Sequence, residues 1–355
     1  MDVFTYEAAR ILIPFVMSFV VGILLTPVLT HYLYKHEVWK KKTGKIALDG
    51  REAENFNKLH QAQEGQTPRM GGIVIWASVL ITASVFSLLA LMLDGSFTRL
   101  NFVTRGQTWL PLFALITGAF VGFLNDLLDV TTPDARGISL RYRLIAVVLI
   151  SGFIAWWFYA KLGVAAVGIP FLGVLPLGLF FIPFFILVAL VVYASGVIDG
   201  IDGLSGGIFA IIFMSYAAIA FAQNQVALGA FCATVSGATF AFLWFNIPPA
   251  RFWMTETGSM ALTLTLTVVA FSADVLGEGV GIAVLPIIAF PLFATVASNI
   301  LQMFWKKVFK KKLFHIAPLH HHFEVLGWPS YKVTMRYWII TIIAGIFGVA
   351  IALLK

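Results

Sequence analysis

Long runs of hydrophobic residues alternate along the chain with short polar or glycine-rich breaks. Runs such as 73–93 contain no charged residue and reach the roughly 20 residues that a helix needs to cross a bilayer. Read in order, the runs predict about ten transmembrane helices. These helices lie near residues 11–34, 70–93, 108–125, 143–160, 176–195, 206–222, 226–245, 259–273, 280–305 and 333–354, the ninth being interrupted at Pro286 and Pro291. We therefore expect an all-α polytopic membrane protein in which residues 1–355 form a single domain.

The composition supports a membrane protein and narrows the kinds of site that it can hold. Hydrophobic residues make up 60% of the chain and charged residues 12%, whereas about 25% of an ordinary soluble domain is charged. The first hydrophobic run has no basic leader and no small-residue cleavage site, so we expect a retained helix rather than a signal peptide. The one cysteine, Cys232, lies inside a hydrophobic run, which excludes a disulfide framework and a thiolate metal site.

The basic residues predict the orientation of the helices. The breaks after the first, third, fifth, seventh and ninth spans contain 19 of the 24 lysines and arginines. Basic loops stay in the cytoplasm, so both termini should lie outside and these loops inside the cell. Topology and attraction to anionic lipid headgroups explain the lysine runs at 40–45 and 306–312. Binding of nucleic acid is not needed to account for them.

Two pairs of carboxylates lie in these basic breaks or at their edges. Asp199 and Asp202 stand among glycines at 199–207, where a spacing of three would place both on one helical face. Glycines there would let backbone amides approach phosphate oxygens, and a solvated turn is the alternative interpretation. Acids at membrane depth are costly and usually functional, which favours the first interpretation. Asp126 and Asp129 end the third span, where the helix dipole disfavours anions. They therefore suggest a compensating cation, and the candidates are Mg²⁺, Arg136, Arg141 and Arg143.

The remaining polar segments allow more than one interpretation. In 246–260, Thr257 and Ser259 are N-cap candidates, and Glu256 is either a first-turn anion or an oxygen ligand for Mg²⁺. His320, His321 and His322 are consecutive, so their side chains diverge, whereas zinc sites prefer spaced ligands. Hydrogen bonding to phosphate or proton transfer by one histidine fits better. Segment 66–72 is by itself a loop-to-helix junction with ordinary turn chemistry.

Acids, glycines, arginines and histidines thus gather on one side of the predicted membrane protein. Such a combination suits a magnesium-bound diphosphate substrate that is handled at the lipid boundary.

Together these segments resemble the polyprenyl-phosphate N-acetylhexosamine-1-phosphate transferase family over nearly the whole chain. Residues 68–72 look like its Pro-Thr-Met-Gly-Gly segment, and residues 199–204 like its Asp-Gly-x-Asp-Gly-Leu segment. Residues 246–259 look like its stretch from Asn-x-Pro-Pro-Ala to Asp-x-Gly-Ser. Residues 318–324, Pro-Leu-His-His-His-Phe-Glu, resemble in particular the branch of the family that transfers phospho-MurNAc-pentapeptide.

The resemblance implies transfer of phospho-MurNAc-pentapeptide from UDP-MurNAc-pentapeptide to undecaprenyl phosphate, with lipid I and UMP as products. It implies Mg²⁺ as the cofactor, a multi-pass protein of the bacterial inner membrane, a cytoplasmic active site and a homodimer. Carried over by position, the catalytic residues are Asp126, Asp199, Asp202 and His320. The substrate-binding residues are Asn246, Trp253, Asp202, His321, His322 and Arg143, with Trp253 stacking on uracil and Asn246 at the diphosphate. The metal ligands are Glu256 and Asp126.

Several positions depart from the family pattern. Asn125 replaces the first acid of an Asp-Asp pair, Asp129 and Arg143 replace lysines, and Glu256 replaces a magnesium-binding aspartate. Gly196 and Glu64 also replace an asparagine and a lysine. Because Asn125 cannot ionise, we favour direct attack by the lipid phosphate over a covalent aspartyl intermediate at that position. The longer Glu256 side chain predicts slower turnover or an altered metal preference.

Three other interpretations stay open at this point. A sister transferase could use UDP-N-acetylglucosamine, although the histidine segment argues against it. A catalytically silent paralogue that binds nucleotide-sugar or lipid is suggested by Asn125, Asp129 and Glu256. A transporter ranks last, because transporters place their coupling sites near the membrane midplane, whereas these acids are predicted on one face.

Overall fold

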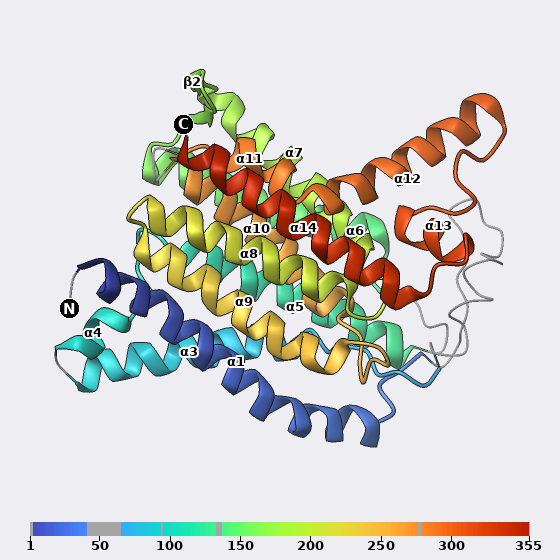
Figure 1. Cartoon of the computed structure of the whole chain (residues 1–355), viewed down its shortest axis with the longest axis horizontal. Helices are drawn as coiled ribbons and strands as arrows, with labels where there is room; N and C mark the ends of the chain where they lie inside the picture. The colour runs from blue at the N-terminus through green and yellow to red at the C-terminus, as the bar shows by residue number, and fades with distance from the viewer. Residues whose placement is uncertain (1–2, 41–64, 94, 133–136, 276–278, 355) are drawn as a thin grey trace.

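The computed structural model describes residues 3–40, 65–93, 95–132, 137–275 and 279–354. Its long helices run side by side along one axis (Figure 1). Nine described helical segments are long and apolar enough to cross a membrane, and a bent pair raises the number to ten. The nine segments are built from α1 (Val3–Lys35), α3 (Ile73–Met92), α5 (Trp109–Thr131), α6 (Leu140–Leu162), α7 (Phe181–Ala194) with its flanking 3-10 turns η1 (Gly178–Phe180) and η2 (Ser195–Ile198), α8 (Leu204–Ala222), α9 (Val226–Asn246), α10 (Thr255–Val275) and α14 (Ser330–Leu353). The prediction of an all-α polytopic membrane protein with about ten spans is therefore confirmed.

The bent pair replaces the continuous ninth span that the hydrophobic pattern predicted. Helices α11 (Gly281–Ile288) and α12 (Phe290–Phe309) meet at an angle of 71°. The break falls at Ala289, and Pro291 follows in the first turn of α12, where its missing N–H removes no helical hydrogen bond. Pro286 lies inside α11. Helix α12 projects away from the bundle, as Figure 1 shows.

The described residues also include short elements that the pattern did not predict. These elements are the helices α4 (Ser96–Leu100) and α13 (Leu319–Val325) and the antiparallel strands β1 (Ala166–Ile169) and β2 (Gly173–Pro176). The hairpin is fastened to the bundle by buried Asp274, whose carboxylate accepts hydrogen bonds from the backbone N–H groups of Gly168 (2.8 Å) and Ile282 (3.2 Å). This buried acid therefore supports the loops at one end of the bundle.

Three helices form the centre of the bundle. In the most hydrophobic 18-residue stretch of α8, α9 and α10, 78%, 89% and 94% of the residues are buried. The corresponding fraction is 28% in α1, α6 and α14. Small residues let the central helices approach their neighbours, as is common in membrane helix packing. At Gly237 of α9, for example, a Cβ atom would overlap the backbone carbonyl of Phe15 on α1. The lipid-facing surface therefore belongs mainly to the outer helices.

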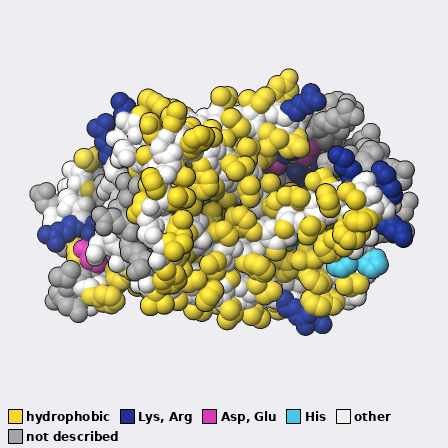
Figure 2. Space-filling view, turned by 90° about the horizontal axis from the view of Figure 1, so that it is seen from above, with side chains coloured by type: hydrophobic (Ala, Val, Ile, Leu, Met, Phe, Trp, Pro, Cys, Tyr) yellow, Lys and Arg dark blue, Asp and Glu magenta, His cyan; other side chains and the backbone are white. Residues whose placement is uncertain are grey.

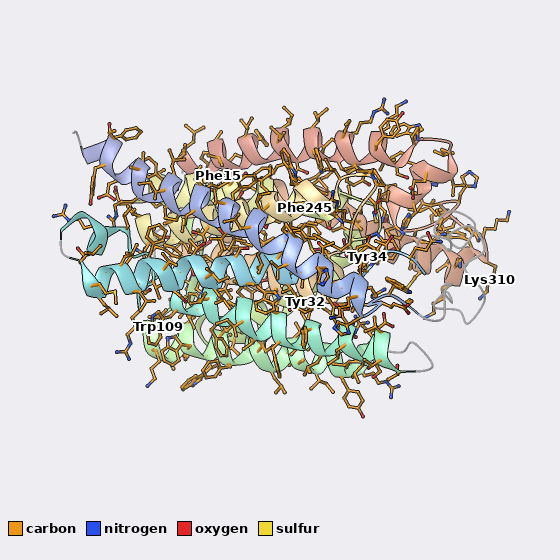
Figure 3. All side chains as sticks on the ribbon, turned by 90° about the horizontal axis from the view of Figure 1, so that it is seen from below. Phe15, Tyr32, Tyr34, Trp109, Phe245 and Lys310 are labelled. Carbon is orange, nitrogen blue, oxygen red and sulfur yellow. The ribbon has the colours of Figure 1, made fainter. Side chains whose placement is uncertain are left out.

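The two ends of the bundle differ. Both termini lie at the end that carries β2, and α13 lies at the opposite end (Figure 1). Figure 3 likewise places Trp109 near the end of the termini and Lys310 at the opposite end. Figure 2 shows hydrophobic side chains across the middle of one face and most lysines and arginines toward the two ends. The predicted basic positions 41–58, together with Glu64 and Arg136, lie outside the described residues.

We predict that the contact between α5 and α10 tolerates no added methyl group. A Cβ atom at Gly122 would overlap the backbone carbonyl of Glu256, whereas at Gly152 of α6 it would meet only Ile186 at 3.7 Å. Overpacking costs about 1–3 kcal/mol, so Gly122→Ala should unfold at a lower temperature in detergent. Gly152→Ala is the control and should be as stable as the wild type. Equal melting temperatures for the two variants would contradict this packing.

Candidate active site

The first turn of α10 lies at the centre of the polar residues. Buried Asp126 of α5 accepts three hydrogen bonds on Oδ2, from Thr255 Oγ1 (2.5 Å), Thr257 N (2.8 Å) and Thr257 Oγ1 (2.5 Å). Backbone N–H groups of a first helical turn have no partner within the helix, and a carboxylate is favourable there. The prediction of an N-cap at Thr257 or Ser259 is wrong, because α10 already begins at Thr255 and its acceptor comes from another helix.

Asp199 holds the same helix start from the other side. Its Oδ2 accepts a hydrogen bond from the N–H of Thr255 (2.9 Å), and its Oδ1 accepts one from Ser205 Oγ (2.7 Å). Burial raises the pKa of the Asp199 carboxyl, while the bonds from Ser205 and Thr255 act to lower that pKa. The predicted shared helical face of Asp199 and Asp202 is wrong, since η2 ends at Ile198 and α8 begins at Leu204.

Asp202 and Asn246 hold the loop that leads into α10. Asp202 accepts hydrogen bonds from the indole Nε1 of Trp253 (3.0 Å) and from the N–H of Ala250 (3.1 Å). Asn246 accepts one from the N–H of Gly203 (3.0 Å) and donates one to the carbonyl of Phe252 (2.8 Å). Both atoms of the Asn246 amide group are therefore engaged by backbone, and Trp253 is fixed in place by Asp202.

Segment 68–72 runs alongside the same loop. The N–H of Trp253 donates to the carbonyl of Pro68 (2.9 Å), and the N–H of Gly71 donates to the carbonyl of Trp253 (2.8 Å). The N–H of Met70 donates to Thr255 Oγ1 at 3.1 Å. A Cβ atom at Gly72 would collide with Gly258 of α10. The glycines of this segment thus permit backbone contact with α10, a role beyond the turn chemistry predicted for 66–72.

Among the described residues, Arg69 is the cation that pairs with the acids of α5. Its Nη2 lies 3.1 Å from Asp129 Oδ2 and 3.9 Å from Asp126 Oδ1, so the two acids do share a helical face. Both acids belong to the last turns of α5, which continues to Thr131, six residues beyond the predicted end of the span. Arg69 was not among the predicted partners. The sequence does offer a clue to this role, because Arg69 stands where the family segment has threonine.

Asn125 joins this cluster through hydrogen bonds that a carboxylate could not make in the same way. Its amide nitrogen donates to Asp126 Oδ1 at 3.2 Å, and its amide oxygen accepts from the N–H of Ile138 at 2.9 Å. Asn125 therefore fastens the segment that follows α5. Its hydrogen bond also engages Asp126 Oδ1, the oxygen that accepts no hydrogen bond from α10.

Glu256 faces Arg143 rather than the other acids. Its Oε1 forms an ion pair with Arg143 Nη1, and its Oε2 lies 3.5 Å from the hydroxyl of Tyr193. The two charged side chains are 23% and 21% exposed, so the pair is accessible from outside the bundle. In Figure 2 a hollow near the end opposite the termini shows acidic and basic side chains at its bottom.

The three histidines lie in two different places. His320 and His321 pack against Gly200, where a Cβ atom would come within 2.8 and 2.7 Å of their Nε2 atoms. His321 Nδ1 lies 2.7 Å from Glu324 Oε2. His322 points away and stacks on His315 with ring centroids 5.4 Å apart. Desolvation, followed by the neighbouring His315, lowers the pKa of His322. Two of the three histidines therefore adjoin the Asp199 loop, and His322 does not.

The acids do not form the magnesium site that the resemblance implies. In the part of the chain that the structure describes, no three acidic, histidine or cysteine side chains are grouped so as to hold a metal ion. Both oxygens of Asp126 accept hydrogen bonds from Thr255, Thr257 and Asn125, and Glu256 is paired with Arg143. The residues present thus do not fit a metal bound by Glu256 and Asp126 together.

We predict that Thr257→Val destabilises the protein. The variant removes one hydrogen bond to a buried carboxylate, and leaving a buried polar group underbonded costs about 1–3 kcal/mol. Thr265→Val is the matched control, because the Thr265 hydroxyl donates only to the carbonyl of Ala261 in its own helix. The free energy of unfolding in detergent should fall more for Thr257→Val. A loss of equal size in both variants would contradict the role of Asp126.

Comparison with known proteins agrees with these motifs. The family model described as glycosyl transferase family 4 matches residues 108–274. The chain is 31% identical to a phospho-N-acetylmuramoyl-pentapeptide-transferase of Clostridium perfringens over 336 residues, covering 94% of this chain and 96% of the relative. The protein of the same name from Chloroflexus aggregans is 30% identical over 368 residues, covering 99% and 92%. The chain therefore belongs to the phospho-N-acetylmuramoyl-pentapeptide-transferase family.

Proposed function

We propose that the chain transfers phospho-MurNAc-pentapeptide from UDP-MurNAc-pentapeptide to undecaprenyl phosphate, forming lipid I and UMP. One observation carries the proposal. Segments 68–72, 122–129, 199–205 and 246–259, which are far apart in sequence, meet around the first turn of α10, and His320 and His321 adjoin them at Gly200. These are the segments through which the chain resembles its family.

The reaction that we propose is a direct displacement at phosphorus. An oxygen of undecaprenyl phosphate forms a bond to the phosphorus attached to MurNAc, and the bond from that phosphorus to the bridging oxygen breaks. The electron pair of the broken bond stays on UMP. The lipid phosphate is already ionised near neutral pH, so the attacking group needs no base, and the protein has to position two anions and neutralise charge on the leaving group.

The contacts of the acids support a direct displacement. Asp126 and Asp199 accept hydrogen bonds from the start of α10, and Asp202 accepts them from the loop that precedes α10. Both oxygens of each acid are thus directed at protein donors, whereas a nucleophilic carboxylate would have to be directed at the substrate phosphorus. We assign these three acids to positioning the site.

The substrate contacts divide among the remaining residues. Trp253 is held by Asp202 and offers an aromatic face for uracil stacking. Arg69 and Arg143 supply fixed positive charge for phosphate oxygens. The contacts of Asn246 with Gly203 and Phe252 support a role in shaping the loop rather than in binding the diphosphate. His320 and His321 stay predicted contacts of the diphosphate or the sugar.

The setting follows from the arrangement of the bundle. Because basic loops face the cytoplasm, we propose that the end carrying α13 and Lys310 lies on the cytoplasmic side of the bacterial inner membrane. There UDP-MurNAc-pentapeptide is available from water and undecaprenyl phosphate from the bilayer. A homodimer and a requirement for Mg²⁺ stay predictions of the resemblance.

Purified protein in nanodiscs tests the proposal directly. We expect undecaprenyl-diphospho-MurNAc-pentapeptide, detected by mass spectrometry, from undecaprenyl phosphate and UDP-MurNAc-pentapeptide, and no lipid product from UDP-N-acetylglucosamine. Lipid product from UDP-N-acetylglucosamine alone would identify the sister transferase. Binding of the muramoyl nucleotide without any product would identify a silent paralogue, which the pairing of Glu256 with Arg143 would then explain.

Trp253→Ala should weaken nucleotide binding. Stacking of an aromatic ring on a base contributes about 1–3 kcal/mol, so KM for UDP-MurNAc-pentapeptide should rise at least about fivefold, with a smaller change in kcat. Trp253→Phe keeps an aromatic ring but loses the hydrogen bond to Asp202. Its KM should therefore lie between that of the wild type and that of Trp253→Ala. The control is Trp244→Ala on α9, since Trp244 is 66% exposed. An unchanged KM in Trp253→Ala would exclude the stacking role.

A further inference from the structure

We infer that the guanidinium of Arg143 occupies the position of a divalent cation at Glu256, so that the reaction proceeds without a resident metal ion. This inference rests on the proposed function, because it concerns how the diphosphate is neutralised. It begins from one juxtaposition. Arg143, at the start of α6, is in direct ion-pair contact with Glu256, the residue that stands where the family has its magnesium-binding aspartate.

The contact leaves Glu256 little capacity for a metal. Its Oε1 pairs with Arg143, and its Oε2 faces the Tyr193 hydroxyl at 3.5 Å. A dication at the carboxylate would also lie beside a permanent positive charge and be repelled by it. A lysine could lose its proton under such repulsion, but a guanidinium does not deprotonate in proteins. The exchange of lysine for Arg143 therefore makes the cation at this position permanent.

The neighbouring acids do not supply the metal ligands that Glu256 lacks. Asn125 directs an N–H donor at Asp126 Oδ1, where a second carboxylate would offer an acceptor. Asp126 Oδ2 accepts three hydrogen bonds from α10. Mg²⁺ needs near-octahedral oxygen ligands at about 2.0–2.1 Å, and a metal beside Glu256 would have to break these bonds or lack protein ligands.

Two arginines place positive charge where a metal would otherwise bring it. Arg69, in place of the family's threonine, lies 3.1 Å from Asp129, and Arg143 adds a second guanidinium at the accessible side of the cluster. Guanidinium groups bind phosphate through two parallel hydrogen bonds. On substrate binding, Arg143 exchanges Glu256 for diphosphate oxygens and neutralises the charge that develops on UMP.

A simple surface ion pair is the competing explanation, and it makes a different prediction. Exposed ion pairs contribute little to stability, and a pair of that kind would leave both metal binding and metal dependence unchanged on removal of the arginine. The two explanations therefore predict different metal affinities for a variant without Arg143, and metal affinity can be measured without any turnover.

Binding of Mn²⁺ to the purified full-length chain, followed by electron paramagnetic resonance, is the first measurement. Arg143→Ala should bind Mn²⁺ at least tenfold more tightly than the wild type, and the added Glu256→Gln change should abolish that gain. Arg141→Ala, which removes an exposed arginine from the same helix turn, is the control and should match the wild type. Equal affinity in the wild type and Arg143→Ala would overturn the inference.

Lipid I formation in EDTA is the second measurement. The wild type should keep at least half of its rate, whereas Arg143→Ala should lose at least tenfold and recover part of the loss on addition of Mg²⁺. Complete loss of wild-type activity in EDTA would overturn the inference. If no variant forms product under any condition, the proposed function fails, and the Mn²⁺ titration still decides whether Arg143 displaces a metal.

Discussion

The N–H groups of Thr255 and Thr257 at the start of α10 are buried and need acceptors, and two carboxylates from other segments supply them. Asp126 reaches from α5 and Asp199 from the loop before α8, and together they bind Thr255 and Thr257. Leaving such groups unpaired at the membrane boundary would cost several kcal/mol. This constraint fixes the relative positions of α5, α10 and the loop at 199–205.

The other parts of the site depend on that arrangement. Once α10 is held, Gly72 and Gly122 allow the neighbouring backbones to lie directly against its first turn. The preceding loop then brings Trp253 to Asp202, and Glu256 emerges beside Arg143. The acids of the motifs thus fall into two groups. Asp126, Asp199 and Asp202 accept hydrogen bonds from the start of α10 and its preceding loop, whereas Asp129 and Glu256 pair with Arg69 and Arg143.

Much of the fold could be predicted from hydropathy, because the apolar runs that give the helices are long and the breaks between them are polar. The errors have identifiable causes. Helix α5 continues past its predicted end because Asn125, Asp126 and Asp129 point into a protein interior that satisfies them, whereas a hydropathy pattern treats them as a loop. The hairpin of β1 and β2 escaped notice because its residues are mostly apolar on both faces.

The site was predicted as a set of residues but not as a set of contacts. The resemblance identified Asp126, Asp199, Asp202, Asn246 and Trp253, and these residues do lie around one helix start. The ion pairs of Arg69 with Asp129 and of Arg143 with Glu256 join residues that are 60 and 113 positions apart. No local pattern encodes such pairs, because they depend on which helices pack together.

The claim that the motif acids hold the framework, while the lipid phosphate attacks directly, can be tested by measuring UMP release from UDP-MurNAc-pentapeptide in rapid-quench experiments. The account predicts UMP only when undecaprenyl phosphate is present, in an amount equal to the lipid product. A burst of UMP equal to the amount of enzyme without the lipid acceptor would show a covalent intermediate and would contradict the account.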